Sequence, residues 1–333
     1  MPINRSFTLV RRPSGMPEDA DFALVTDETP GLSEGQFLVR NHYASLDPAM
    51  RGWMDDKPSY MPPIRLGDVI RASTIGVVVQ SRHADFPEGA WVATLGGIAE
   101  YSVQQTGRLI DPAALPLVTN YLSVGTGVGP TAYLGLLDIG KPRAGETVLV
   151  SGAAGGVGSL VGQIAKIQGC RAIGIAGGPE KCARLIDDYG YDAAIDYRGK
   201  SEQELVSAIR AAAPDGVDVQ FENVGGAILD AGLMNLNAKG RVVLCGLISQ
   251  YNSDPAPSRN LWQLIVHGAR IEGFILTQHI ARIPQAAAQL TQWVNEGRLR
   301  IDEHIEEGIE NALPAFLRLF AGTNHGKMIL KLS

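Results

Sequence analysis

The sequence predicts an α/β protein of two domains, a doubly wound parallel sheet of six strands and a second, β-rich unit. At 333 residues the chain is longer than one hydrophobic core usually serves. The pattern also changes along the chain, from short β-rich runs to apolar strands that alternate with amphipathic helices. We expect residues 1–122 and 298–333 to form the β-rich domain and residues 123–297 to form the parallel-sheet domain.

The β-rich domain is predicted from short strand-forming runs that proline and glycine turns separate. Phe37–Arg40 and Ile75–Val79 are examples, and they indicate an antiparallel or barrel-like unit. Near the end of the chain, a short helix is expected at Ala312–Phe320 and a last strand at Lys327–Leu332. We expect this tail to return to the first domain.

Six apolar segments predict the parallel sheet, and helical segments separate them. One helix start is marked by Ser201 and Glu204, which form a capping box ahead of Leu205. A further helix is expected around Gln285–Asn295. The predicted strands are Thr147–Ser151, Ala172–Ala176, Ala193–Asp196, Val217–Phe221, Arg241–Cys245 and Arg270–Leu276.

Composition and charge disfavour several classes of partner. Lys and Arg total 29 against 35 Asp and Glu, and the net charge of −6 gives no general attraction to nucleic acid or anionic lipid. No run of about 18 apolar residues predicts a membrane span. The N-terminal residues lack the apolar core of a secretory signal, and Cys170, Cys182 and Cys245 are widely spaced. We therefore expect a cytoplasmic protein with reduced thiols.

The first predicted strand of the parallel sheet runs into a glycine-dense turn, Gly152–Gly158, and then into a helix. Glycines let the backbone approach a pyrophosphate, whose charge is favoured by the free N–H groups at the start of a helix. The strict G-x-G-x-x-G pattern is not met, because Ala153 occupies the first glycine position. A glycine-rich turn can also serve plain strand-to-helix packing. Its place at the first of six strands favours dinucleotide binding and a Rossmann domain.

The end of the second strand selects between the two nicotinamide cofactors. An NAD site usually places an acid there, to hold the ribose 2′-hydroxyl. Here the strand ends in small residues, Ala176–Gly178, and Lys181 follows. The open space and the cation suit a 2′-phosphate, which favours NADPH. The alternative is that Lys181 only solvates a helix start.

Metal catalysis is not expected. A zinc dehydrogenase needs Cys or His ligands in its first domain and at the junction with the second. This chain has no cysteine before Cys170, and His42 and His83 lie outside a recognisable ligand pattern. His42 is more simply interpreted as a surface or hydrogen-bonded histidine.

Several blocks in order along nearly the whole chain resemble the zinc-independent medium-chain dehydrogenase/reductase superfamily. Within it, the sequence is similar to the group of prostaglandin reductases, alkenal double-bond reductases and curcumin reductases. The matching blocks are Tyr43–Gly52, Thr131–Tyr133, Gly177–Cys182, Glu222–Gly226, Cys245–Asn252 and Asn324–Lys327.

The resemblance implies a GroES-like first domain completed by the C-terminal tail, a Rossmann second domain and a homodimer. It also implies hydride transfer from NADPH to the β-carbon of an α,β-unsaturated ketone or aldehyde. Lys181 and Tyr197 would hold the 2′-phosphate, and the residues of the glycine turn would cradle the pyrophosphate. The cofactor residues so assigned are Thr131, Ala154, Gly155, Gly156, Val157, Gly158, Gly178, Lys181, Tyr197, Asn223, Cys245, Phe274 and Asn324.

Two positions depart from the family pattern. Glu222 stands where Asp is commoner, and Thr94–Ile98 lacks an aromatic residue often found there. The second departure bears on the shape of the substrate pocket.

Without a metal, negative charge that develops on the substrate carbonyl must be met by hydrogen-bond donors. Tyr251 follows the fifth strand, where ligands of such sheets bind, and we assign it the lead role as donor or proton source. Tyr43 would be a second donor that orients the carbonyl, and Tyr60 a weaker candidate for the pocket wall. Cys245 is expected to pack near the nicotinamide and not to act as a nucleophile. The alternative is that these tyrosines only present an apolar body and a polar tip.

Three other functions stay open at this point. A quinone reductase of the same superfamily would share the fold and the cofactor. A cofactor-binding structural or interaction protein would have kept the fold without catalysis. Gene regulation through RNA or DNA is disfavoured by the acidic balance of the chain.

Overall fold

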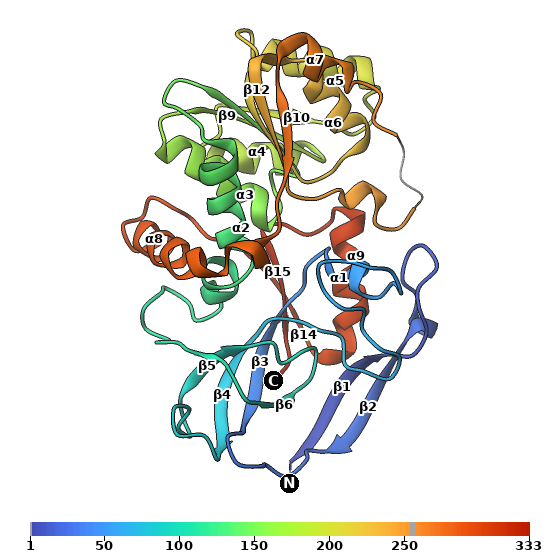
Figure 1. The fold of residues 1–333 in the computed structure, drawn as a ribbon, viewed down its shortest axis with the longest axis vertical. Coiled ribbons are helices and arrows are strands. Elements are labelled where there is room, and N and C mark those ends of the chain that lie inside the picture. Colours follow the sequence, from blue (N-terminus) through green and yellow to red (C-terminus); the bar gives the residue numbers. More distant parts are fainter. Residues whose placement is uncertain (1, 254–256) are drawn as a thin grey trace. The chain divides into compact units, whose positions relative to one another are not determined.

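The computed structural model describes residues 2–253 and 257–333. These residues form two compact units (Figure 1). Unit 1 comprises the chain up to Gly127 together with Glu303–Ser333. Unit 2 comprises Val128–Asp302. In the described part of the chain, no helix combines the length and the apolar character needed to span a bilayer.

Unit 1 is the β-rich, GroES-like domain. A hairpin of β1 (Ile3–Leu9) and β2 (Phe22–Glu28) accompanies a second sheet in the order β14-β15-β3-β4-β5-β7, with β6 paired to β3. Its strands are β3 (Phe37–Ser45), β4 (Thr74–Ser81), β5 (Trp91–Thr94), β6 (Tyr101–Gln104), β7 (Arg108–Leu109), β14 (Glu303–Glu307) and β15 (Lys327–Lys331). Its helical segments are η1 (Asp19–Asp21), α1 (Met50–Trp53), η2 (Tyr121–Gly125), η6 (Ile309–Asn311) and α9 (Ala312–Ala321).

The C-terminal tail completes this domain, as predicted. Strand β15 pairs antiparallel with β3, so that Ile329 lies opposite Ser45. Helix α9 buries Leu313 and Phe316 in a core that also contains Leu9. The hydrophobic face of the tail helix is therefore covered by the first domain, which explains why the chain returns.

Unit 2 is a complete doubly wound sheet, which confirms the predicted Rossmann domain. Its strands are all parallel and follow the order β10-β9-β8-β11-β12-β13. They are β8 (Thr147–Ser151), β9 (Arg171–Ala176), β10 (Ala193–Asp196), β11 (Val217–Glu222), β12 (Leu236–Leu244) and β13 (Arg270–Gly273). The helical segments are α2 (Val128–Leu134), η3 (Gly135–Gly140), α3 (Gly156–Ile167), α4 (Pro179–Asp187), α5 (Glu202–Ala212), α6 (Gly226–Leu233), η4 (Ile248–Gln250), α7 (Trp262–His267), η5 (Leu276–Arg282) and α8 (Ile283–Asn295).

Two predicted strand ends were too long. Cys245 lies just after β12, and the last strand ends at Gly273 instead of Leu276. The ladder between the two strands ends at the pair Leu244 and Gly273. Beyond it, the backbone N–H groups of Cys245 and Gly246 donate to the Glu222 carbonyl, so β13 has no further partner.

The predicted capping box at the start of α5 is confirmed. Ser201 Oγ accepts from the N–H of Glu204 at 3.3 Å, and a Glu204 carboxylate oxygen accepts from the N–H of Ser201 at 2.8 Å. Two of the otherwise unsatisfied N–H groups at this helix start are thereby paired.

Glycines let helix α3 lie very close to the rest of the domain. A Cβ at Gly162 would approach three atoms of the Tyr191 side chain more closely than 3.0 Å. The phenol of Tyr191, which is fully buried between α3 and the sheet, donates to the Gly158 carbonyl at 2.7 Å. The Tyr191 ring thus fixes the first turns of α3, and it fits there because residue 162 has no side chain.

Candidate functional site

The glycine turn joins β8 to α3 at the carboxyl edge of the parallel sheet. Gly152 takes a positive φ of 58°, so the tight turn that usually needs the first glycine of the motif is made one residue before Ala153. The N–H of Gly155 closes the turn by donating to the Gly152 carbonyl at 3.0 Å. Gly158 allows close helix packing, because a Cβ there would collide with the backbone of Gly152 and Ala153.

The turn fits a phosphate group. Helix α3 begins at Gly156 with Gly155 as its N-cap, and no side chain caps it. Free N–H groups and the positive end of the helix dipole therefore face the space before the helix. The predicted turn residues, Ala154–Gly158, all lie at this one place.

A buried carboxylate joins the first and fourth strands. Glu222 ends β11 and is fully buried, and one of its oxygens accepts from the Ser151 hydroxyl at 2.7 Å. The same oxygen accepts from the backbone N–H groups of Val224 and Gly225, at 2.7 and 2.8 Å. Gln220 donates to the other oxygen at 2.7 Å. Burial raises the pKa of Glu222 above its ordinary value, although these hydrogen bonds favour the charged form.

This network holds Asn223, a predicted cofactor residue. The Asn223 N–H donates to Ser151 Oγ and its side-chain amide donates to the Ser151 carbonyl, both at 2.7 Å. A Cβ at Gly152 would lie 3.5 Å from the Cβ of Asn223. Asn223 therefore lies against the glycine turn, with its backbone and side chain both fixed.

Tyr251 and Cys245 lie beside Asn223. The Asn223 carbonyl accepts from the N–H of Ile248, and a Cβ at Gly246 would lie 3.1 Å from the Tyr251 hydroxyl and 3.4 Å from the Asn223 carbonyl oxygen. The Tyr251 oxygen also accepts a long hydrogen bond, 3.4 Å, from the N–H of Leu247. The structure thus brings three predicted residues together at the ends of β11 and β12.

The Cys245 thiol is not set up as a nucleophile. Burial raises its pKa to about 12, and the neighbouring charge of Glu222 acts in the same direction. A nucleophilic cysteine needs the opposite surroundings, which stabilise the thiolate.

A second group of predicted residues lies at the ends of β9 and β10. Gly178 is the N-cap of α4 with a φ of 95°, and Lys181 lies in the first turn of that helix. Tyr197 follows β10, and a Cβ at Gly177 would lie 3.1 Å from its ring and from its hydroxyl. The structure adds Arg198, which sequence reasoning missed: its guanidinium lies over Gly177 and Gly178.

The charges around this second group favour an anion. Burial lowers the pKa of Lys181, and the positive charge of Arg198 lowers it further. The nearby acid, Asp196, accepts from the N–H groups of Gly178 and Arg198 at 2.8 and 3.0 Å. These backbone hydrogen bonds lower the pKa of Asp196 and hold its carboxylate within the loop.

Thr131 and Phe274 lie on neighbouring segments of the same unit. Thr131 is in α2, and Gly135 begins η3 directly after that helix. A Cβ at Gly135 would lie 2.6 Å from the Phe274 ring, so this ring packs against the end of the helix that carries Thr131. The cofactor roles of both residues stay predictions.

Tyr43 and Asn324 belong to unit 1. Tyr43 lies on β3 opposite Ile75 and Lys331, and its partly buried ring packs against the apolar cluster around Ile75. Asn324 is buried just before β15. Tyr60 is exposed, with its ring 6.4 Å from that of Trp53. Their predicted roles are likewise untested.

The residues do not fit a catalytic metal. Among residues 2–253 and 257–333, no three or more His, Cys, Asp or Glu side chains gather in a group that could hold a metal ion. His42 is partly buried on β3, with its ring 5.2 Å from that of Trp91 and its Nδ1 atom 3.4 Å from the carbonyl of Ser333.

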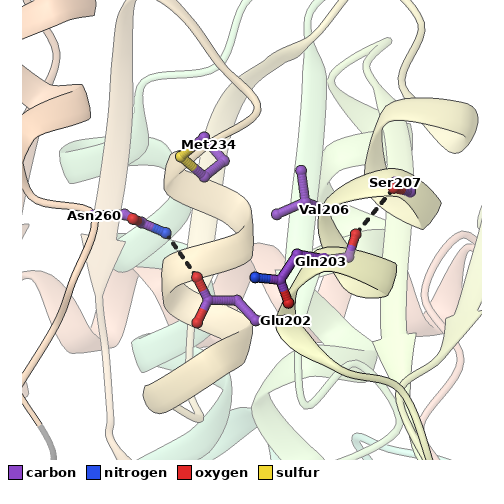
Figure 2. Close-up of a pocket in the computed structure, with 6 residues that line it drawn as sticks. All are labelled: Glu202, Gln203, Val206, Ser207, Met234 and Asn260. Atoms are coloured by element: carbon purple, nitrogen blue, oxygen red, sulfur yellow. Dashed lines mark hydrogen bonds between the residues drawn. The ribbon is translucent and has the colours of Figure 1, made fainter.

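A pocket of about 360 Å³ lies in unit 2, between helix α5 and the segments that carry Met234 and Asn260 (Figure 2). Its polar groups already bind within the protein. Asn260 donates to Glu202 at 3.1 Å, and the Ser207 hydroxyl donates to the Gln203 carbonyl at 2.9 Å. None of the predicted site residues lines it. Its lining residues are Glu202, Gln203, Val206, Ser207, Met234 and Asn260.

Comparison with protein families places both units. Residues 5–111 match the model described as the N-terminal domain of oxidoreductase, and residues 156–293 match the model described as zinc-binding dehydrogenase. The NADPH-dependent curcumin reductase of Escherichia coli is 39% identical over 338 residues, covering 99% of this chain and 97% of that protein. The chain belongs to the zinc-independent medium-chain dehydrogenases/reductases. Prostaglandin reductase 1 of Mus musculus is 38% identical, with 98% of each chain covered.

Solved structures of this family agree with the fold. The crystal structure of CurA from Vibrio vulnificus in complex with NADPH is 39% identical, covers 99% of each chain and gives a TM-score of 0.92. The name of the second matching model refers to zinc, whereas the Cys and His residues of this medium-chain dehydrogenase/reductase supply no such site among the described residues.

Proposed function

We propose that this chain is an NADPH-dependent reductase that reduces the carbon–carbon double bond of an α,β-unsaturated ketone or aldehyde without a metal. The observation that carries the proposal is identity of about two residues in five, over nearly the whole chain, to a protein named NADPH-dependent curcumin reductase. A similar level of identity to prostaglandin reductase 1 adds a second relative named as a reductase.

The residues fit the proposed cofactor. The uncapped start of α3 offers backbone N–H groups to the pyrophosphate, and Gly158 lets that helix start approach the turn. At the end of β9, glycines stand where an acid would hold the 2′-hydroxyl of NAD, and Lys181 lies in the first turn of α4. When bound, NADPH would supply the hydride.

The chain's own side chains would meet the charge that develops on the substrate oxygen. We assign the lead role to the Tyr251 phenol, as hydrogen-bond donor or as the source of the later proton. Tyr43 would be the second donor and would orient the carbonyl. Glu222 and Ser151 would act indirectly, because they fix Asn223 beside the nicotinamide end of the cofactor.

We also propose that the protein is a cytoplasmic homodimer. Strand β13 is at the edge of the parallel sheet, and apolar side chains of α7 and η5 are exposed: Trp262 at 65%, Ile265 at 69% and Ile280 at 65%. Exposed apolar clusters and open sheet edges favour association. The free thiols of the three cysteines support a reducing compartment. Sedimentation of the parent as a dimer, and of the Ile265→Glu variant as a monomer, is the expected result; a monomeric parent at micromolar concentration contradicts it.

The experiment that tests the function is a panel of enones, alkenals and quinones, each assayed with NADPH and with NADH. The expected result is oxidation of NADPH by simple enones, with saturation of the double bond in the product confirmed by mass spectrometry. Turnover of quinones alone would instead assign the chain to the quinone reductases. The absence of any NADPH binding in calorimetric titration would overturn the proposal.

A further inference from the structure

We propose that Arg198 is a second cation of the 2′-phosphate subsite, and that together with Lys181 it determines the preference for NADPH over NADH. This inference rests on the proposed function, because it concerns the cofactor of that reaction. Sequence patterns at the second strand do not point to Arg198, which lies after the third strand of the sheet.

The position of Arg198 is built by the two loops that meet at this edge of the sheet. A Cβ at Gly177 would lie 3.2 Å from its Nε atom, and a Cβ at Gly178 would lie 3.2 Å from an Nη atom. The guanidinium therefore lies over the backbone where the adenosine end of the cofactor is expected. Asp196 fixes the arrangement, because its Oδ1 atom accepts from the N–H groups of both Gly178 and Arg198.

The charges at this place are those of a phosphate site. Arg198 is close enough to Lys181 to lower the pKa of that lysine, after the larger effect of burial. The backbone N–H groups of Gly178 and Arg198 already hold the Asp196 carboxylate, and the Arg198 charge lowers its pKa further, but among the described residues no salt bridge joins the Arg198 guanidinium to it. A phosphate monoester of charge about −2 would relieve the repulsion between the two cations.

An arginine also suits the geometry of a phosphate. Its planar group presents parallel N–H donors that bind two phosphate oxygens at once, and it stays charged at any physiological pH. NADH carries a hydroxyl in place of this phosphate, so the same contact would discriminate between the cofactors. The neighbouring Lys200 provides a matched control for charge alone: it is exposed like Arg198 and its charge also lowers the pKa of Asp196, but no Lys200 atom comes within 4 Å of a Cβ at Gly178.

The test measures dissociation constants of NADPH, NADH and adenosine 2′,5′-bisphosphate by calorimetry for the parent protein and for Arg198→Ala, Arg198→Lys and Lys200→Ala. For Arg198→Ala we expect affinity for the two 2′-phosphorylated ligands to fall about tenfold, while affinity for NADH changes by less than about twofold. Arg198→Lys should retain part of the affinity, since lysine keeps the positive charge but lacks the parallel N–H donors that bind two phosphate oxygens at once. Lys200→Ala should change no affinity by more than about twofold.

Each alternative outcome has a distinct meaning. If Arg198→Ala left NADPH affinity unchanged, or weakened NADPH and NADH equally, the role of Arg198 would be rejected and the proposed reductase function would stand. An equal loss of NADPH affinity in Lys200→Ala would show a general field of positive charge and would also reject a specific contact by Arg198. If the parent itself bound no NADPH, the proposed function would fail first and this inference with it.

Discussion

Replacing Gly162 by alanine is expected to destabilise unit 2, although alanine is the better helix former. Gly162 lies within α3, where alanine would gain about 1 kcal/mol in helix propensity. The added Cβ would overlap the Tyr191 ring, which is buried and held by its hydrogen bond to the Gly158 carbonyl. Overpacking of this kind costs about 1–3 kcal/mol.

Whether the Gly162→Ala change stabilises or destabilises the protein depends on whether the Tyr191 ring can move. Gly174 closes the opposite side, because a Cβ there would lie 3.0 Å from the same ring, so the ring has little space for a rotation. A shift would also lengthen the buried Tyr191 hydrogen bond, worth about 1 kcal/mol. The balance is a loss of about 1–3 kcal/mol in the free energy of unfolding.

Urea unfolding followed by circular dichroism measures this loss, and calorimetric titration with NADPH shows whether the first turn of α3 is displaced. Gly52→Ala is the control, because Gly52 is helical and a Cβ there meets nothing within 4 Å. That variant should be at least as stable as the parent. A Gly162→Ala protein as stable as the parent would show that the Tyr191 ring yields at little cost, and the reasoning from close packing would be wrong.

Three further predictions concern single side chains. Tyr251→Phe keeps the ring and removes the donor, so turnover of an enone should fall by about 10²-fold; a rate within about twofold of the parent rules out the assigned role. Cys245, with its pKa raised to about 12, should remain a neutral thiol at pH 8 and resist iodoacetamide until the protein is unfolded, as mass spectrometry of the peptides can show. Ser201→Ala should cost about 1 kcal/mol through loss of the helix cap, whereas Ser207→Ala on the same helix should cost almost nothing; equal effects in urea unfolding would contradict the capping argument.

The parallel-sheet domain could be predicted from the sequence because its signals are local. Each buried strand is a short apolar run, and the capping box at Ser201 and Glu204 lies within four residues. The end of the last strand could not be predicted in this way. Whether β13 continues past Gly273 depends on its ladder partner, and that partner ends where the chain after β12 turns to bind the Glu222 carbonyl.

The candidate site shows the same division between local and distant signals. The glycine turn and Lys181 are visible in the sequence, because phosphate recognition needs small residues and a cation at fixed distances from a strand end. Arg198 follows a different strand, and only the order of the sheet places it over Gly177 and Gly178. A pattern within one segment cannot reveal a contact that two segments create.

Glu222 illustrates how a departure from a family pattern can have a structural cause. The carboxylate must turn back to the N–H groups of Val224 and Gly225 and also reach Ser151 on the neighbouring strand. The extra methylene of glutamate, compared with aspartate, lets one carboxylate oxygen accept hydrogen bonds both from the Ser151 hydroxyl and from the two backbone N–H groups. Because Ser151 in turn accepts from the N–H of Asn223, shortening the Glu222 side chain would loosen a predicted cofactor residue through the Ser151 hydroxyl. The identity of residue 222 therefore matters to the site through the position of Asn223, and not through chemistry of its own.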